Sequence, residues 1–325
     1  MTARAARLRH TPPVLPPDSQ PAPAAVDIPS YVTEIRAEAV WQAQQRAHEA
    51  RLRPVLDPYL ARRSRGQADP VMDFLFEYYA FRPAQLLRWS PGLGVALAGP
   101  AAEAFLDQTG FVRTPAGVTL DPSSFPRRRL DAVRWTRRLL AGTAARPPFL
   151  GCSGLHEWAM VYRTTAVRHP QVPLRLPPDA IAAVVDAGPV VCSHFDAFRF
   201  FTPAARPLNR HQPTRSAMPD FEQPGCLHTN MDLYRWAFKL APYVPGDLLA
   251  DTFLLACRIR EVDMRASPYD LRDRGLSPIP VETPEGRRHY RACQQRFAAE
   301  AAPLRARLIA AYDRLIAALD DPGTP

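Results

Sequence analysis

The sequence predicts a mainly α protein, with a single compact helical domain and one small β-hairpin. Three observations predict this class: long stretches with helical spacing of apolar residues, no internal repeat, and only one pair of short alternating runs. The 325 residues are 46% hydrophobic and 9% aromatic, enough for one large core. We expect this domain, as the catalytic one, over residues 31–320, after a disordered proline-rich tail over residues 1–30.

The first expected helix covers residues 31–65 and carries many charges. Pro54 and Pro58 lie inside it and should break or kink it, since proline lacks the amide hydrogen that a helix needs.

A second helix is expected over residues 71–79, after the start signal Asp69-Pro70. It is apolar almost all round, which is typical of a buried helix. Its two carboxylates, Asp73 and Glu77, should therefore find arginine partners, a metal ion or water.

The remaining elements follow from turn and cap signals. Residues 111–120 form two alternating runs around a turn and predict the hairpin. Residues 127–140 hold six arginines and predict a basic amphipathic helix, suited to phosphates or to a solvated surface. Thr283 should cap a helix that Pro303 interrupts, and a last helix is expected over residues 304–319.

Charge and cysteine usage limit the partners. The net charge of +9 permits binding to a polyanion such as DNA, although a solvated basic surface gives the same number. All but one of the 41 basic residues are arginine, and Lys239 is the only lysine. The five cysteines are widely spaced, which argues against disulfides or a cysteine zinc site and favours a cytoplasmic location. No run of eighteen apolar residues predicts a membrane span, and the oligomeric state stays open.

Chemically versatile residues gather in the segment 151–270. It holds five of the eight histidines, four of the five cysteines, both asparagines and the only lysine. We therefore expect the working site in this segment.

The first motif of the segment is GCSGLHEWAMVYR, residues 151–163. Read as a helix, it places Glu157 on one face with Trp158 and Tyr162. Burial would raise the pKa of that carboxyl group, which suits a general acid or base, while a buried pair with arginine is the alternative. His156 should be partly exposed.

The second motif is VVCSHFDAFRFFTP, residues 190–203. His194, Asp196 and Arg199 are embedded with Cys192 in an apolar run, so they need polar partners. Periodicity does not decide between a strand and a helix here.

The third motif is PGCLHTNMDLYRWAFKL, residues 224–240. As a helix it aligns His228, Asp232, Arg235 and Lys239 on one polar stripe, while the other faces are apolar. His228 and Asp232 could share a metal ion or act as an acid–base pair, whereas a stripe of surface ion pairs is the alternative.

A fourth run, CRIREVDMRASPYD, covers residues 257–270 and ends its helix at Ser267-Pro268. Asp263 and Arg265 are expected to support the site or to pair with each other.

These motifs carry a resemblance to a known family. The chain resembles actinobacterial proteins described as 3-methyladenine DNA glycosylases, from about residue 35 to 320, at the strings DPVMDFLFEYY, LHEWAMVYR, CSHFDAFRFFTP, PGCLHTNMDLYRWAFKL and EVDMRASPYDL. The resemblance implies hydrolysis of the N-glycosidic bond of an alkylated adenine in DNA, without a cofactor. The chain lacks a helix-hairpin-helix signature and helical repeats, so no catalytic residue is carried over by position.

Under this resemblance the chain would supply each part of the reaction. A carboxylate would activate water, the flipped base would lie in an aromatic pocket, and arginines would hold phosphates. The catalytic candidates are Glu157, Asp196, Asp232 and Lys239. The substrate-binding candidates are Trp158, Tyr162, Arg199, Asn230, Tyr234, Arg235 and Arg265, with Trp236 as a further stacking residue. The phosphate-binding candidates are Arg127, Arg128, Arg134 and Arg138.

The residues alone support a rival hypothesis. Glu157, His194, His228 and Asp232 are the kind of ligands that a helical non-haem metal protein, of ferritin-like or haem-oxygenase-like architecture, uses for iron, manganese or zinc. Asp196, Asp73 and Glu77 extend this inventory. The alternative function is then a metal-dependent oxidase or oxygenase that acts on a small molecule.

Overall fold

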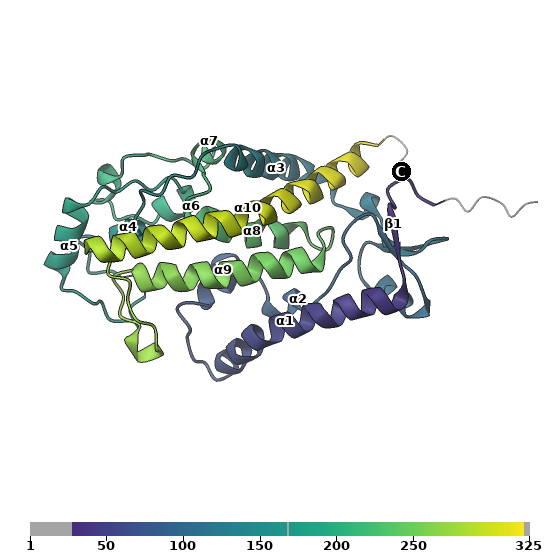
Figure 1. Cartoon of the computed structure of the whole chain (residues 1–325), viewed down its shortest axis with the longest axis horizontal. Helices are drawn as coiled ribbons and strands as arrows, with labels where there is room; N and C mark the ends of the chain where they lie inside the picture. The colour runs from purple at the N-terminus through teal and green to yellow at the C-terminus, as the bar shows by residue number, and fades with distance from the viewer. Residues whose placement is uncertain (1–27, 168, 322–325) are drawn as a thin grey trace, which may run out of the picture.

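Three long helices at the carboxyl end of the chain form the centre of the structure, a computed structural model that describes residues 28–167 and 169–321. These helices are α8 (Leu227–Leu240), α9 (Gly246–Ala266) and α10 (Pro284–Asp320). Only residues 241–245 join α8 to α9, so the two helices pack closely as antiparallel neighbours. Helix α10 packs against both (Figure 1).

Further helices cover this layer on both sides. Helix α1 (Glu38–Ser64) packs against α9, and α3 (Leu130–Ala144) packs against α10 on the opposite side (Figure 1). Short helices fill the loops between them: α2 (Pro83–Leu86), α4 (Leu155–Ala159), α5 (Pro178–Ala187), α6 (Phe195–Phe198) and α7 (Met218–Phe221). One π-helical turn, η1, covers Phe74–Tyr78. The 3-10 turns are η2 (Pro100–Asp107), η3 (Pro122–Ser124), η4 (Arg127–Arg129), η5 (Arg206–Leu208) and η6 (Arg272–Arg274).

A small four-stranded sheet lies at one end of the helices, beside the end of α10 (Figure 1). Its strands are β1 (Glu34–Arg36), β2 (Val95–Leu97), β3 (Phe111–Thr114) and β4 (Gly117–Leu120), in the order β1-β2-β4-β3. The expected hairpin is confirmed as the antiparallel pair β3–β4, with Thr114 opposite Gly117. Strands β1 and β2 pair in parallel and extend it, which the sequence did not predict.

The mainly α class is therefore confirmed, and several helix boundaries are corrected. Helix α1 continues through Pro54 and Pro58, and α10 continues through Pro303 as a single helix of 37 residues. All three prolines are solvent-exposed. Water can therefore bond the carbonyl groups that they leave free, which lets each helix run on. The expected tail, residues 1–30, lies outside the described residues except for its last three.

The segment 71–79 is also corrected. It is a turn followed by η1, and Glu77 is exposed while Asp73 is half-buried. Asp73 accepts a hydrogen bond from the hydroxyl group of Tyr59 at 3.1 Å. Neither carboxylate joins the metal-ligand groups described below. Within the described residues, no helix is both long enough and apolar enough to cross a membrane.

Candidate active site: a buried histidine and carboxylate centre

The site begins at a tight turn before α4. Gly154 caps the helix with a φ of 75°, and Ser153 before it has a φ of 50°. Glycine tolerates this left-handed backbone, and a Cβ atom at Gly154 would meet the ring of Tyr290 at 3.3 Å. The turn points the next side chains, His156 and Glu157, into the core, where both are buried.

Among the described residues, those other than glycine that have a strained backbone with positive φ lie close to the site. Ala80, Ser153 and Arg163 are the non-glycine residues with positive φ in the described part of the chain. Ala80 closely follows η1, and the other two flank α4. Such backbone strain costs about 1–3 kcal/mol per residue and concentrates at functional sites.

Helices α8 and α9 supply the facing side of the site. His228 and Asp232 lie one turn apart on α8, as the stripe predicted, and both are buried. Arg260 and Asp263 lie on the last turns of α9, each 1% exposed. The close packing of the two helices brings these four side chains together.

Two short helices complete the site. His194 is the N-cap of α6, where its Nδ1 accepts a hydrogen bond from the Ala197 amide at 3.2 Å. The same amide also lies 3.2 Å from the His194 carbonyl oxygen, so the ring shares this donor. Glu222 follows α7 and is 1% exposed. The second motif is therefore a cap and a short helix, which settles the choice between strand and helix.

These side chains form two adjacent sets that together we call the buried centre. The four-residue set is His156, Glu157, His228 and Asp263, and the three-residue set is His194, Glu222 and Asp232. Within each set one ligand atom per residue lies within 4.8 Å of the others. The rings of His194 and His228 stack with their centroids 5.3 Å apart, and this contact connects the two sets.

The four-residue set is already bonded internally. Asp263 accepts from His156 Nε2 at 2.8 Å and from Arg260 Nη1 at 2.8 Å. The same Arg260 nitrogen donates to Glu157 at 3.0 Å. One guanidinium group therefore holds both carboxylates of this set.

The three-residue set is looser. His194 Nε2 lies 3.4 Å from Asp232 and 3.6 Å from Glu222 Oε1. Asp232 also accepts from the Tyr79 hydroxyl at 2.6 Å and from Arg235 at 3.3 Å. Glu222 Oε1 is buried and has no hydrogen-bond partner.

Burial and charge set the protonation of the centre. Burial raises the pKa of Glu222 to about 7 and lowers that of His228 to about 3, which leaves this imidazole neutral. Burial alone would also raise the pKa of Asp232 and of Asp263, but neighbouring cations hold both below the usual value. Arg235 is the main such neighbour of Asp232, and His156 that of Asp263.

Residues of the buried centre line a small, mostly enclosed cavity, which we call the closed cavity. Its free volume is about 10 Å³, close to the space of one water molecule. Its lining combines the aromatic rings of Phe74, Tyr78, Tyr79 and Phe200 with polar groups of the buried centre. A nucleobase would enter only after this cavity opened.

The centre unites many of the residues predicted from the sequence. Glu157, His194, His228 and Asp232 all line the closed cavity, as does Asp196, which forms an ion pair with Arg235 at 2.6 Å. The stripe on α8 is thus partly an ion-pair stripe, since Asp232 contacts Arg235. Arg199 also pairs with Asp196, at 3.0 Å.

Other predicted residues lie elsewhere. Trp158 is fully buried and donates to the Ala266 carbonyl oxygen, and the Tyr162 hydroxyl donates to Asp186. Asn230 is buried between the Pro224 carbonyl oxygen and Arg305, and Tyr234 packs among phenylalanine rings. None of these four residues lines the closed cavity.

The remaining candidates lie on or near the surface. Arg265 pairs with Glu261 and does not pair with Asp263. Two of the arginines proposed for phosphates are tied to α10, Arg127 through the Leu319 carbonyl oxygen and Arg134 through Asp320. Arg128 is exposed, while Arg138 and Lys239 line an open cleft described below.

The sequence did not reveal two members of the buried centre, His156 and Glu222, or the arginine that bonds to it, Arg260. His156 was expected to be partly exposed, which is wrong: it is 2% exposed and bonded to Asp263. Glu222 follows a four-residue helix, where no periodicity marks a buried face. Arg260 looked like one of several arginines in an alternating run, and only the contact between α8 and α9 shows that it is buried.

Comparison with known proteins gives no relative from which to transfer a role. No family model, no curated protein and no solved structure matches the chain. The functional argument therefore rests on the geometry of the buried centre.

Proposed function

We propose that the protein is a metal-dependent enzyme whose three-residue set, His194, Glu222 and Asp232, binds one divalent iron or manganese ion. The reaction would be of the oxidase or oxygenase type on a small molecule. One imidazole and two carboxylates are ligands that these ions accept.

The charge of the centre carries this proposal. Four carboxylates belong to the centre and Asp196 adjoins it, whereas three guanidinium groups, those of Arg199, Arg235 and Arg260, contact four of these five acids, all but Glu222. The difference is two negative charges, and an uncompensated buried charge is unfavourable. Protonated His156 beside Asp263 supplies one positive charge. The remaining negative charge lies in the three-residue set, where a divalent cation would offset it.

The position of the excess selects the three-residue set. In the four-residue set, Arg260 already contacts both carboxylates. In the three-residue set, Glu222 Oε1 has no donor although it is buried. An unpaired carboxylate oxygen beside an imidazole is a suitable place for a cation.

The cavity supports a small first reactant. It has room for about one water molecule and is walled by aromatic rings, which suits water or dioxygen rather than a large polar group. Tyr79, hydrogen-bonded to Asp232, would hold that carboxylate in place.

Metal analysis tests the proposal. The full chain is purified without chelator, and bound metals are measured by mass spectrometry before and after anaerobic incubation with Fe(II) or Mn(II) and desalting. We expect about one equivalent per chain. Glu222→Gln should reduce the affinity at least about tenfold, whereas the matched variant Glu157→Gln should keep the metal. A wild-type protein that binds neither ion after incubation, or a Glu222→Gln variant that binds as well, would contradict the proposal.

A second candidate is a metal-independent DNA glycosylase for alkylated adenine. The observation that favours it is Asp232, which lines the cavity beside Phe74 and Tyr78 as a water-activating carboxylate beside a stacking surface would. Protonation of Glu222, whose pKa is raised to about 7 by burial, would then offset the remaining charge in place of the ion. Chelator-treated protein that releases 3-methyladenine from methylated DNA would favour this candidate, and metal-loaded protein that releases none would reject it.

A further inference from the structure

An open cleft lies between α3 and α8 and shares one lining residue, Asp196, with the closed cavity. Its volume is about 840 Å³, within the range of about 300–1,000 Å³ that small-molecule sites occupy. Arg215, Ser216, Met218 and, from α10, Tyr312 also line it. We call it the tryptophan cleft, because Trp135 of α3 and Trp236 of α8 meet in it with ring centroids 6.0 Å apart.

Positive charge dominates the cleft. Five cationic side chains line it, against two carboxylates: Arg129, Arg138, Arg215, Arg235 and Lys239, with Asp131 and Asp196. Asp196 pairs with Arg235. Over the described residues, no carboxylate lies within 4.0 Å of the cationic groups of the other four.

The other arginines of α3 do have carboxylate partners among the described residues, unlike Arg138. Arg134 of α3 pairs with Asp320 at 2.7 Å, and Arg137 pairs with Asp313 at 2.7 Å. Arg138 follows directly and lines the cleft without such a partner. Among the arginines of α3, Arg138 is therefore the one whose guanidinium group is available to an anion in the cleft.

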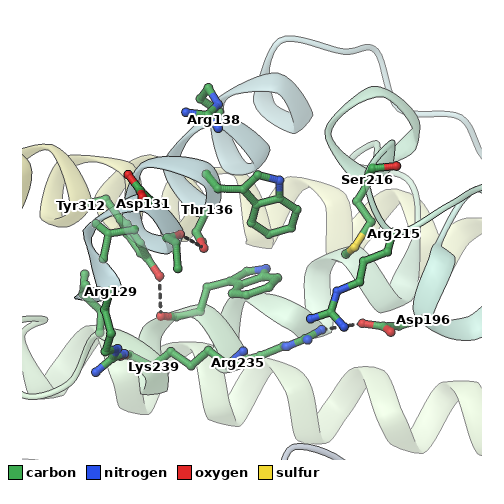
Figure 2. A pocket seen from close by; sticks show the side chains of 16 residues that line it. Arg129, Asp131, Thr136, Arg138, Asp196, Arg215, Ser216, Arg235, Lys239 and Tyr312 are labelled. Atoms are coloured by element: carbon green, nitrogen blue, oxygen red, sulfur yellow. Dashed lines mark hydrogen bonds and ion pairs between the residues drawn. The ribbon is translucent and has the colours of Figure 1, made fainter. Parts of the chain in front are cut away.

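The cleft is arranged for an anion beside an aromatic ring. Arg129 donates to the Lys239 carbonyl oxygen. The cationic groups of Lys239 and Arg235 both lie over the Trp236 ring, and Arg215 reaches towards Arg235 (Figure 2). Partial burial is the main cause that lowers the pKa of Lys239, and the positive charge of Arg235 is the second. An anion bound beside the amine would stabilise its protonated form. Trp236 is 4% exposed, whereas Trp135 is half-buried and keeps part of its ring accessible.

We infer that the tryptophan cleft binds a small aromatic anion, a planar ring that carries a phosphate or carboxylate group. The ring would pack on Trp135, and the anion would pair with Lys239 and Arg215. A long polyanion fits less well, because Asp131 and Asp196 line the same cleft and would repel it. This inference is independent of the metal proposal, since none of the three proposed ligands lines the cleft.

Calorimetric titration of the full chain with 1-naphthyl phosphate tests the inference. Two control titrants are used: 1-naphthol, which lacks the phosphate group, and inorganic phosphate, which lacks the aromatic ring. We expect the probe to bind at least about tenfold more tightly than either control, because ring and anion contribute together. Repeating the titration with chelator should leave the Kd unchanged and so separates this result from the metal question.

Matched variants locate the binding. Trp135→Leu should weaken binding of the probe about tenfold. Lys239→Gln and Arg215→Gln should each weaken it about three- to fivefold. Arg288→Gln, which removes an exposed arginine paired with Glu285, is the control and should leave the Kd unchanged.

Three outcomes would overturn the inference. The first is a probe that does not bind, and the second is inorganic phosphate that binds as tightly as the probe. The third is a Kd that none of the three cleft variants changes. If a DNA oligonucleotide bound through Lys239 while the probe did not, the cleft would be a nucleic-acid surface instead.

Discussion

Asp263 is the residue on which the four-residue set depends most. It is 1% exposed and accepts from both His156 and Arg260, so it joins an imidazole to a guanidinium group inside the core. Removing a buried charge from such a network leaves its partners uncompensated, which costs far more than losing a surface ion pair.

We predict that Asp263→Asn lowers the free energy of unfolding by about 3 kcal/mol or more. The asparagine keeps the volume but leaves Arg260 with one carboxylate fewer and His156 without its ion-pair partner. Chemical denaturation followed by circular dichroism measures the change. Asp251→Asn is the control, because Asp251 is partly exposed and pairs with Arg51 and Arg307 at the surface. That control should cost less than about 1 kcal/mol, and equal losses in the two variants would refute a special role for Asp263.

For single residues, the sequence showed which residue types would form the site, but it did not show which of them would pair with one another. His194 and Asp232 are 38 positions apart, yet their side chains lie 3.4 Å apart because α6 and α8 meet at the buried centre. The spacing His228–Asp232 was recognisable, since one turn of helix separates them. The pairing of His156 with Asp263, 107 positions away, depends on how α4 packs on α9 and has no local signal.

Helix α10 shows what local signals can and cannot predict about an element. Its N-cap was predicted correctly: the Thr283 hydroxyl group accepts from the Gly286 amide at 3.1 Å. Its interruption at Pro303 was wrong, because the proline is exposed and the helix is held by buried residues on both sides of it, among them Phe297 and Leu308. A cap is a local contact, whereas the continuation of a helix past a proline depends on tertiary packing.

We predict that Thr283→Ala destabilises the protein by about 1 kcal/mol, because the Gly286 amide loses its acceptor at the start of α10. Thr283→Ser keeps the hydroxyl group and should recover most of the loss. Thermal unfolding of the three proteins measures the effect. A serine variant as unstable as the alanine variant would show that the cap bond is not the cause.

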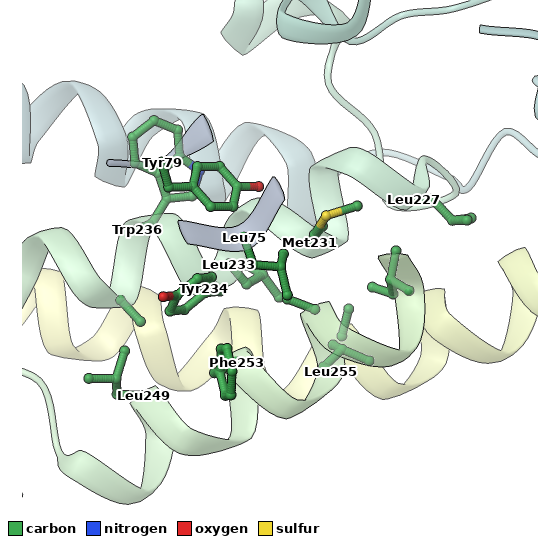
Figure 3. Packing of buried hydrophobic residues seen from close by; sticks show 14 of the residues in the cluster. Leu75, Tyr79, Leu227, Met231, Leu233, Tyr234, Trp236, Leu249, Phe253 and Leu255 are labelled. Atoms are coloured by element: carbon green, nitrogen blue, oxygen red, sulfur yellow. The ribbon is translucent and has the colours of Figure 1, made fainter. Parts of the chain in front are cut away.

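Over the whole molecule, one hydrophobic core connects the elements. Buried residues form a continuous cluster from Trp41 of α1 to Leu319 of α10. Around α8 and α9 it contains Leu75, Met231, Leu233, Tyr234 and Phe253 (Figure 3). The sheet joins the same cluster through Val95, Leu97 and Val118. The prediction of one large helical core followed from composition, whereas the parallel pairing of β1 with β2 joins residues about sixty positions apart and left no pattern in the sequence.

A continuous core implies that the sheet end and the buried centre unfold together. We predict a single transition in denaturant, with the same midpoint by far-ultraviolet circular dichroism, which reports the helices, and by tryptophan fluorescence. The tryptophans report distant parts of the core, since Trp41 and Trp89 stack near the sheet while Trp158 packs beside the buried centre. Asp263→Asn, although it lies at the buried centre, should therefore shift both midpoints equally. Two separate transitions, or a shift seen by only one probe, would show that the two regions are independent folding units.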